Sequence, residues 1–352
     1  MLTRSCQIWV VVGCLVSCAA EESAGKPKQE ILATRLLSWT LTSAQLSEAP
    51  RWPTFLFVDG NRGLVWGGDQ GLLRIPLKPN AGLPEPFGEE FTSGLDALVA
   101  GARAWDGTFA VVDSSGRVAV KRLFAGKSAS FETHFLNRPG SLAVTEAKVY
   151  LLLQGDLEQG PAVVAYTHSG KEVGRWGEMP ASGILQARLK GGGIAACSDG
   201  SVFYSYINSP QIIRIARGET SRTTKLGRKS GSFKTLSARA IRRAQREAKQ
   251  SRSVAPLVKL GLSTSRVQSL FCSQKGLLLR QVAQPKGGGA HIEVWDSRAE
   301  SLIGAMPTGD AVLLDVRDDT LYLGALRDGH AFSLDRIQVA VVMSRLLGSV
   351  RP

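Results

Sequence analysis

The clearest indication of how this chain folds is SDGSVFYSYINSPQIIRIARGE, residues Ser198 to Glu219. It contains a turn of small polar residues, an aromatic run, an Asn-Ser-Pro turn and a second apolar run. Val202, Tyr204 and Tyr206 alternate with the residues between them, so they share one face of an extended chain. Two short antiparallel strands joined by a turn are therefore predicted here.

The same order of apolar strand, polar turn and second strand recurs along the chain. With residues Ile194 to Glu219 counted as one copy, the other copies are Phe55 to Leu77, Arg103 to Gly126, Ser141 to Trp176, Leu270 to Gly304 and Leu313 to Val339. An irregular repeat of about 40 residues, each unit a small antiparallel sheet, is typical of propeller blades. Six blades are therefore expected.

The stretch at Ser198 also resembles a blade of the bacterial six-bladed β-propeller proteins, of the NHL-repeat and strictosidine-synthase-like type. The resemblance lies in its aromatic second strand, its Asn-Ser-Pro turn and its Ile-x-Arg-Ile third strand. DQGLLRIPL and GRVAVKRLFAG echo the third strand more faintly. The resemblance covers residues 31–345 and implies an all-β chain folded as a six-bladed β-propeller.

The first apolar segment of this region, Ile31 to Thr42, is strand-like but has no blade of its own. A propeller commonly closes when a strand from one terminus completes the blade built by the other, which removes an exposed sheet edge. This segment is therefore expected in the last blade, next to the C-terminal run VAVVMSRLL. Residues 346–352 are expected to form a C-terminal tail.

The first residues of the chain predict export. Arg4 precedes an apolar run from Ile8 to Val16, and polar residues follow at once, as in a secretory signal rather than a spanning helix. Leu15-Val16-Ser17-Cys18 also resembles the lipobox of bacterial lipoproteins. That resemblance implies cleavage before Cys18, acylation of Cys18 with chains such as palmitate, and attachment to the cell envelope, in the outer membrane if there is one.

Two alternatives to processing at Cys18 stay open. Cys14 also fits the lipobox loosely, but it would leave an apolar core of only Ile8 to Val12. Ordinary cleavage near Ala20 would leave no lipid anchor. Under the leading interpretation residues 1–17 are the signal peptide, residues 18–30 are the lipidated cysteine and a flexible tether, and the folded domain follows.

The net charge of +13 is concentrated in one region of the chain. Between Arg214 and Arg252 there are 13 lysines and arginines against Glu219 and Glu247, a local balance of +11. Without Arg4 the mature chain has +12, so the remainder is near +1. The basic character therefore belongs to an insertion and not to the propeller.

Residues 233–253 of this insertion are predicted to form a helix between blades 4 and 5. Apolar residues recur every four positions from Leu236, the Ser-Gly-Ser at 230–232 offers a cap, and Pro256 marks the far limit. The remaining surface carries the residues proposed for electrostatic binding, which are Arg239, Arg242, Arg243, Arg246 and Lys249. The alternative is a solvated face with no partner.

The chain has five cysteines, of which Cys197 and Cys272 remain after Cys18 is acylated and the leader is removed. An exported protein could oxidise this pair. However, the two residues occupy matching positions in successive repeats, which should lie a whole blade apart and beyond the reach of a disulfide. Two buried free cysteines are therefore expected.

Motifs for chemistry are scarce. No two of the four histidines have metal-ligand spacing, and neither a nucleophile elbow nor a complete phosphate loop occurs. The leading hypothesis is a membrane-tethered, non-catalytic binding or scaffolding module without a cofactor. Its partner would be a protein or an anionic envelope polymer, and not nucleic acid.

The alternative hypothesis is a lactonase- or esterase-type hydrolase with a divalent metal in the central channel. Its candidate ligands are Asp59, Asp113, Asp199 and Asp315, which lie near strand ends. Turn aspartates usually serve local hydrogen bonding. Convergence of several carboxylates in the channel would favour this alternative.

Overall fold

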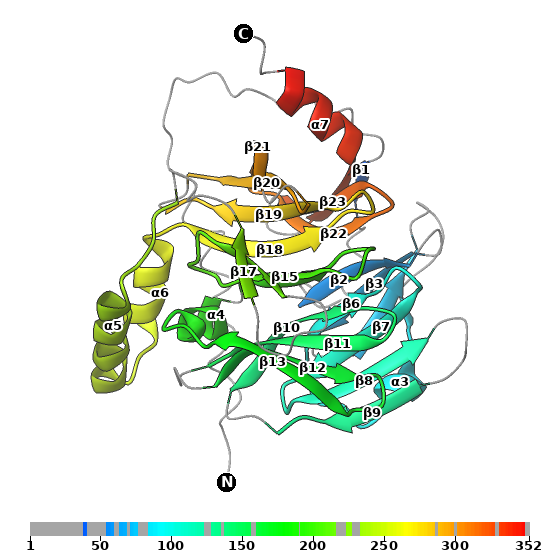
Figure 1. Cartoon of the computed structure of the whole chain (residues 1–352), viewed down its shortest axis with the longest axis horizontal. Helices are drawn as coiled ribbons and strands as arrows, with labels where there is room; N and C mark the ends of the chain where they lie inside the picture. The colour runs from blue at the N-terminus through cyan, green and yellow to red at the C-terminus, as the bar shows by residue number, and fades with distance from the viewer. Residues whose placement is uncertain are drawn as a thin grey trace.

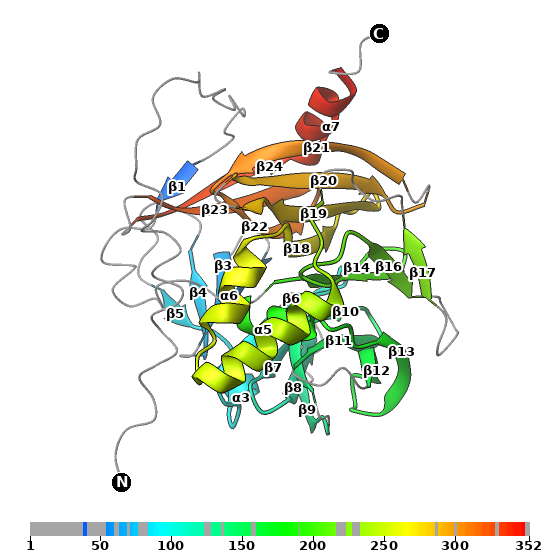
Figure 2. The same cartoon turned by 90° about the vertical axis from the view of Figure 1, so that its left-hand side faces the viewer.

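The described strands form six four-stranded antiparallel sheets, arranged as a six-bladed β-propeller. The computed structural model describes residues 38–40, 54–59, 63–68, 71–76, 84–122, 128–134, 137–155, 160–189, 191–215, 223–226, 233–285, 288–298, 301–327 and 331–348. The leader, Cys18 and the tether lie outside the described residues. Figures 1 and 2 show the sheets next to one another, with several helices on the outside of the propeller.

Each blade corresponds to one predicted repeat. Blade 1 consists of β2 Phe55–Asp59, β3 Gly63–Gly68, β4 Gly71–Ile75 and β5 Glu85–Pro86. Blade 2 consists of β6 Leu98–Arg103, β7 Thr108–Asp113, β8 Arg117–Arg122 and β9 Ser128–Glu132. Blade 3 consists of β10 Arg138–Val144, β11 Lys148–Gln154, β12 Pro161–Thr167 and β13 Glu172–Glu178. Blade 4 consists of β14 Gly193–Ala196, β15 Val202–Ser205, β16 Ile212–Ile215 and β17 Thr223–Leu226. Blade 5 consists of β18 Arg266–Cys272, β19 Leu277–Ala283, β20 Ala290–Asp296 and β21 Ser301–Gly309. Blade 6 consists of β22 Val312–Arg317, β23 Thr320–Arg327 and β24 Ala331–Gln338, together with β1 Ser38–Thr40. The sixfold prediction is confirmed.

The N-terminal strand β1 completes the last blade, as expected. It pairs antiparallel with β24, with Ser38 opposite Asp335 and Thr40 opposite Ser333. The C-terminal run was expected to be its neighbour, but it is the helix α7, Val339–Gly348. Val339 and Val342 of α7 are buried against blades 5 and 6, so this helix covers their outer edge instead of extending the sheet.

Blade 4 shows why the Ser198 stretch folds as it does. Gly200 closes the turn between β14 and β15 with φ of 78°, a left-handed conformation that glycine adopts without steric cost. Every residue of β15 is buried, because this strand lies inside the blade and both of its faces meet neighbouring blades. Tyr204 and Phe203 belong to separate apolar clusters, one shared with blade 3 and the other with blade 5.

Cys197 and Cys272 form a disulfide, so the expectation of free cysteines was wrong. Their Cα atoms are 5.2 Å apart. Cys197 directly follows β14 and Cys272 ends β18, and these are the first strands of adjacent blades. The innermost strands of a propeller converge on its axis, so matching positions there are much closer than the average spacing of blades.

Within the described ranges, four helices besides α7 lie outside the blade strands. They are α3 Glu89–Thr92, α4 Gly183–Leu189, α5 Ala238–Ser251 and α6 Ala255–Leu262. The predicted insertion between blades 4 and 5 is confirmed, but it contains two helices rather than one. Within the described residues no helix is both long and apolar enough to span a membrane.

The boundaries of the insertion differ from the prediction at both ends. Ser237, not the Ser-Gly-Ser at 230–232, caps α5, because its side chain accepts a hydrogen bond from Ala240 N. Pro256 does not end the insertion. It occupies the first turn of α6, where proline costs no hydrogen bond.

Candidate electrostatic contact surface

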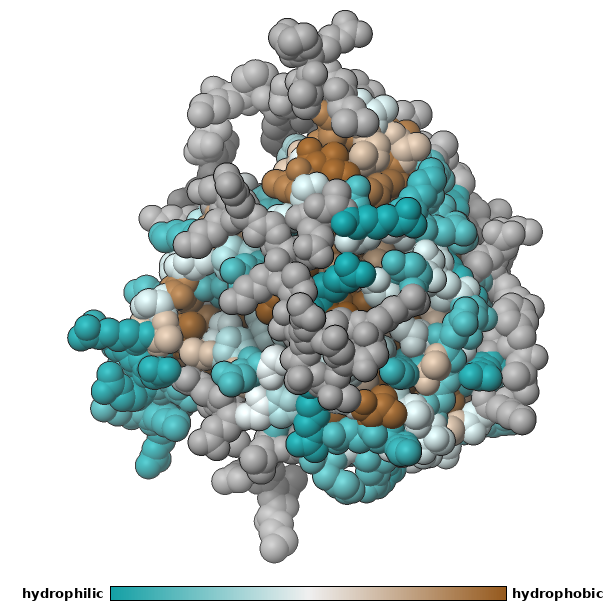
Figure 3. Space-filling model, viewed as in Figure 1, coloured by the Kyte–Doolittle hydropathy of each residue, from teal (hydrophilic) through white to brown (hydrophobic). Residues whose placement is uncertain are grey.

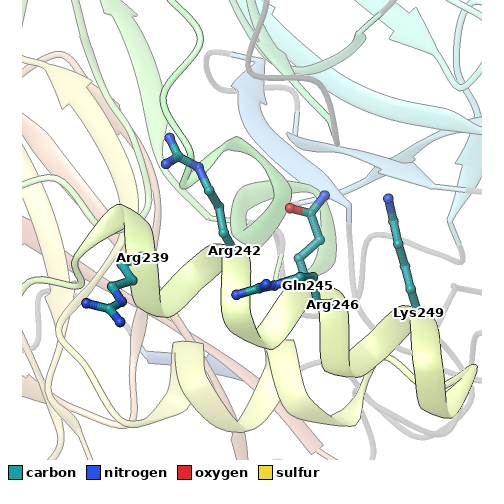
Figure 4. Close-up of a pocket in the computed structure, with 5 residues that line it drawn as sticks. All are labelled: Arg239, Arg242, Gln245, Arg246 and Lys249. Carbon is teal, nitrogen blue, oxygen red and sulfur yellow. The ribbon is translucent and has the colours of Figure 1, made fainter.

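Helix α5 carries a line of cations on one face. Arg239, Arg242, Arg246 and Lys249 follow one another at spacings of three and four residues, and with Gln245 they line an open hollow of about 640 Å³. We call these four residues the cationic ridge. Figure 4 shows their side chains extending from one helix, and the ridge spans about 15 Å at a rise of about 1.5 Å per residue.

Four of the five residues proposed from the sequence thus lie together. The fifth, Arg243, lies outside the ridge lining, and its Nε contacts Glu247 Oε1 at 2.9 Å across one helical turn. Such exposed pairs contribute only a few tenths of a kcal/mol. The pair does, however, place the single acidic residue of α5 beside Arg243 and away from the ridge.

The opposite face of α5 packs on the protein. Ile241 and Ala244 are buried with Ile184 and Leu185 of α4 and Leu257 of α6. Leu236 and Ala248 border the same cluster, so the stripe predicted from the sequence is the packed face. Because that face is occupied, the ridge is held on the side of α5 opposite the packed stripe.

The two ends of the insertion are tied together by Asn208, from the Asn-Ser-Pro turn. Its Oδ1 accepts a hydrogen bond from Leu236 N at 2.7 Å. Its Nδ2 donates to Thr264 Oγ1 at 3.1 Å and to Ser265 O at 2.9 Å. Asn208 is 8% exposed, so these bonds form out of contact with bulk water and fix the start and end of the insertion to blade 4.

A second tie runs between Lys234 and Ser265, at the same place. Lys234 N donates to Ser265 Oγ, and Ser265 N donates to Lys234 O. The chain therefore enters and leaves the insertion at one closed base. A segment closed in this way is a platform for the ridge and not a loose loop.

A buried ion pair in blade 5 supports this base. Arg280 Nε donates to Glu293 Oε2 at 2.8 Å, and both side chains are at most 1% exposed. Arg280 Nη1 also reaches Ser209 O at 3.4 Å, and its guanidinium lies 5.7 Å from the ring of Phe233. The pair therefore joins blade 5 to the Asn-Ser-Pro turn and to the start of the insertion.

The ionisation of Glu293 follows from this setting. Burial alone raises the pKa of Glu293, but the hydrogen bond with His291, the charge and hydrogen bond of Arg280, and the bond from Trp295 together hold it below the usual value. Glu293 is therefore charged at neutral pH. A charged partner is what a buried arginine requires.

Asn208, Arg280 and Glu293 were missed from the sequence. A signal for the pair existed: Arg280 lies within the apolar run LLLRQVA and Glu293 within HIEVWD, on consecutive strands. Their register places them directly opposite each other. Opposite charges at the centres of two consecutive apolar strands predict such a pair.

The four aspartates considered as metal ligands do not form one cluster. Asp113 and Asp199 accept hydrogen bonds from residues of their own turns, Ser115 and Ser201 among them. Within the described part of the chain, no group of three or more His, Cys, Asp or Glu side chains is arranged to hold a metal ion.

Asp59 and Asp315 tie neighbouring blades together near the ring closure. Asp59 contacts Arg74 at 3.0 Å and Arg103 at 3.3 Å. Asp315 accepts a hydrogen bond from Val58 N at 2.7 Å, which links the inner strands of blades 6 and 1. Burial raises the pKa of Asp315 to about 6, although these donors and the nearby arginines oppose the shift.

Solved structures share the propeller architecture. A member of the DUF4221 family from Bacteroides vulgatus matches 85% of this chain and 95% of its own, with 10% identity and a TM-score of 0.55. A gluconolactonase-like protein matches 85% of this chain and 92% of its own, with 12% identity and a TM-score of 0.48. Virginiamycin B lyase from Staphylococcus aureus matches 86% of this chain and 99% of its own, with 12% identity and a TM-score of 0.46. No protein-family model matches the chain, and no curated protein matches its sequence. At 10% identity, the likeness to the DUF4221 member concerns the fold alone.

Proposed function

We propose that this protein is an exported, lipid-anchored β-propeller of the bacterial cell envelope, and that it is a non-catalytic binding module. Its contact surface is the cationic ridge of α5. The observation that carries the proposal is the combination of four cations on one face of α5 with burial of the other face against α4 and α6. The propeller and the tether hold this ridge near the membrane.

Export is supported by the disulfide between Cys197 and Cys272, because such bonds persist in oxidising compartments and are rare in the cytosol. It agrees with the leader and with the lipobox at Leu15 to Cys18. The proposed anchor is the acylated Cys18. Multiple acyl chains give durable membrane attachment.

The proposed partner is an anionic component of the envelope. Four cations within about 15 Å attract such a surface at distances up to the Debye length, about 10 Å at 0.1 M salt. In this compartment nucleic acid is not the expected partner. Electrostatic contacts of this kind speed association and weaken steeply as salt rises.

Two of the candidate aspartates, Asp59 and Asp315, already bond arginines or backbone amides. These bonds support the binding-module hypothesis over metal-dependent hydrolysis. Asp59 is paired with two arginines, and Asp315 receives two backbone hydrogen bonds. A carboxylate in such a role stabilises the join between blades. Recruiting it to a metal would break that join.

The test is cosedimentation with isolated bacterial envelope. Every protein is the full chain carrying Cys18→Ala, so no acyl chain contributes. One variant replaces Arg239, Arg242, Arg246 and Lys249 by Gln; the control replaces four exposed cations elsewhere, Arg122, Arg138, Lys171 and Arg298. Deleting the insertion is a poorer test, because it would expose Ile184 and Leu185.

The ridge variant is expected to lose the salt-sensitive part of envelope binding, while the control keeps it. Binding should fall between about 0.05 M and about 0.5 M salt, where the Debye length shrinks from about 14 Å to about 4 Å. Equal binding by the ridge variant and the wild-type ridge would refute the proposal. The anchor is tested separately, by incorporation of labelled fatty acid at Cys18 and its loss in Cys18→Ala.

A further inference from the structure

The turn between α5 and α6 exposes an apolar side chain beside the cationic ridge. Val254 is 38% exposed, and it is one of two large hydrophobic residues that stand out in this way among the described residues; the other is Leu302 of β21. Lys249 and Arg252 precede Val254, Lys259 follows it, and all three are exposed. We call these four residues the insertion tip.

The insertion tip belongs to the two helices on the outside of the propeller. Figure 1 shows α5 and α6 at the left edge of the body, Figure 2 shows the same helices facing the viewer, and Figure 3 shows hydrophilic residues gathered at that left edge. Arg252 adopts φ of 49°, the left-handed conformation that ends α5 and turns the chain sharply into α6. Val254 therefore lies just beyond the C-terminal end of α5, two residues after the C-cap Arg252 and five residues after Lys249.

These features discriminate between the anionic partners that the ridge alone would allow. A hydrophilic anionic polymer would bind the cations but would give Val254 no apolar environment. A phospholipid surface offers both, since cations contact the headgroups while an apolar side chain enters the boundary with the acyl chains. The apolar face of α5 is already buried, so the insertion cannot enter the bilayer as an amphipathic helix.

We propose that the insertion docks on an anionic phospholipid leaflet, with the cationic ridge over the headgroups and Val254 inserted at the interface. This rests on the proposed function, because it names the partner of the same ridge. Attachment is mainly electrostatic, and Val254 adds a smaller apolar contribution. Docking orients the propeller on the membrane that already holds its tether.

The test uses vesicles of phosphatidylglycerol mixed with phosphatidylcholine, and of phosphatidylcholine alone, with the full chain carrying Cys18→Ala. Binding is expected only where the anionic lipid is present. Each cation near such a surface strengthens partitioning about fivefold, so the four-residue Gln variant should bind about 100- to 1,000-fold more weakly. The control variant of Arg122, Arg138, Lys171 and Arg298 should bind as the wild-type ridge does.

Val254 is tested with two substitutions. Val254→Asp should weaken binding to anionic vesicles several-fold, and because aspartate is a favoured N-cap residue, α6 should still form. Val254→Trp should strengthen binding, and the indole that it introduces should show a blue-shifted fluorescence on vesicles, measured as a difference from the parent chain. Circular dichroism checks that both variants remain folded.

The outcomes separate this proposal from the broader one. If the ridge mediates binding to isolated envelope but not to phosphatidylglycerol vesicles, the lipid proposal is overturned and an anionic polymer or protein is the partner. If anionic vesicles bind but neither Val254 substitution changes binding or fluorescence, the insertion of Val254 is overturned. If the ridge variant binds envelope and vesicles as strongly as its parent, both proposals fall.

Discussion

Reducing the disulfide between Cys197 and Cys272 is expected to lower the free energy of unfolding by about 4.5 kcal/mol. The two cysteines are 75 residues apart, and the entropy of closing a loop of this size in the unfolded chain gives that value. Measured losses are usually about 2–5 kcal/mol. Total stabilities are about 5–15 kcal/mol, so the bond contributes a large fraction of the whole.

The position of the disulfide gives it a second consequence. It joins the inner strands of blades 4 and 5, and the whole of α5 and α6 lies within the loop that it closes. Reduction should therefore loosen the base of the insertion before it disrupts distant blades. Hydrogen exchange at the amides of Leu236 and Ser265, which donate to Asn208 Oδ1 and Lys234 O, should become faster than exchange in blade 2.

The assay is equilibrium denaturation followed by tryptophan fluorescence, with and without a reductant. The double variant Cys197→Ala/Cys272→Ala is the control, because reductant should leave its stability unchanged. Peptide mapping without reduction should recover a peptide pair joined through these two residues. Free thiols at both positions, together with a stability that reductant does not change, would show that Cys197 and Cys272 are not bonded.

Three further predictions concern the base of the insertion and the ring closure. Glu293→Gln should destabilise the protein by about 3–5 kcal/mol in chemical denaturation, because it leaves Arg280 charged and buried without its partner. A loss under about 1 kcal/mol, which is typical of an exposed ion pair, would argue against burial of the pair. Asn208→Ala should cost about 1–3 kcal/mol and accelerate proteolysis within the insertion, since Leu236 N loses its acceptor; unchanged proteolysis would contradict its role as a tie. Because burial raises the pKa of Asp315 from 3.8 to about 6, its ionisation opposes folding. Stability that is fully present below pH 3.8 should fall by about 3 kcal/mol as pH rises through 6, and this component should be absent in Asp315→Asn.

Most of the fold could be predicted because a propeller blade is made of local hairpins. The turn at Gly200 and the alternation at Val202, Tyr204 and Tyr206 are visible within one short stretch. The pairing of β1 with β24 was also predictable, because a lone strand near the N-terminus needs a partner edge. What the local pattern predicted poorly was the state of the run after β24, whose apolar residues suit a buried helix as well as a strand.

The candidate surface was only partly predictable, because its parts depend on tertiary packing. The helical spacing from Leu236 to Ala248 identified the packed face of α5, and the cations of the ridge followed from what remained. The disulfide could not be foreseen from blade spacing, because Cys197 and Cys272 meet only where inner strands converge. The ties made by Asn208 and Arg280 join residues up to 71 positions apart, and no local pattern encodes such contacts.

Covalent labelling of lysines on the envelope-bound protein, read by mass spectrometry, would show whether the cationic ridge is the contact surface. Lys249 belongs to the cationic ridge, and Lys171, exposed in blade 3, is the internal reference. We predict that acetylation of Lys249 falls severalfold when the full chain binds envelope, while acetylation of Lys171 does not change. Undiminished acetylation of Lys249 on fully bound protein would contradict the claim that this ridge is the contact surface.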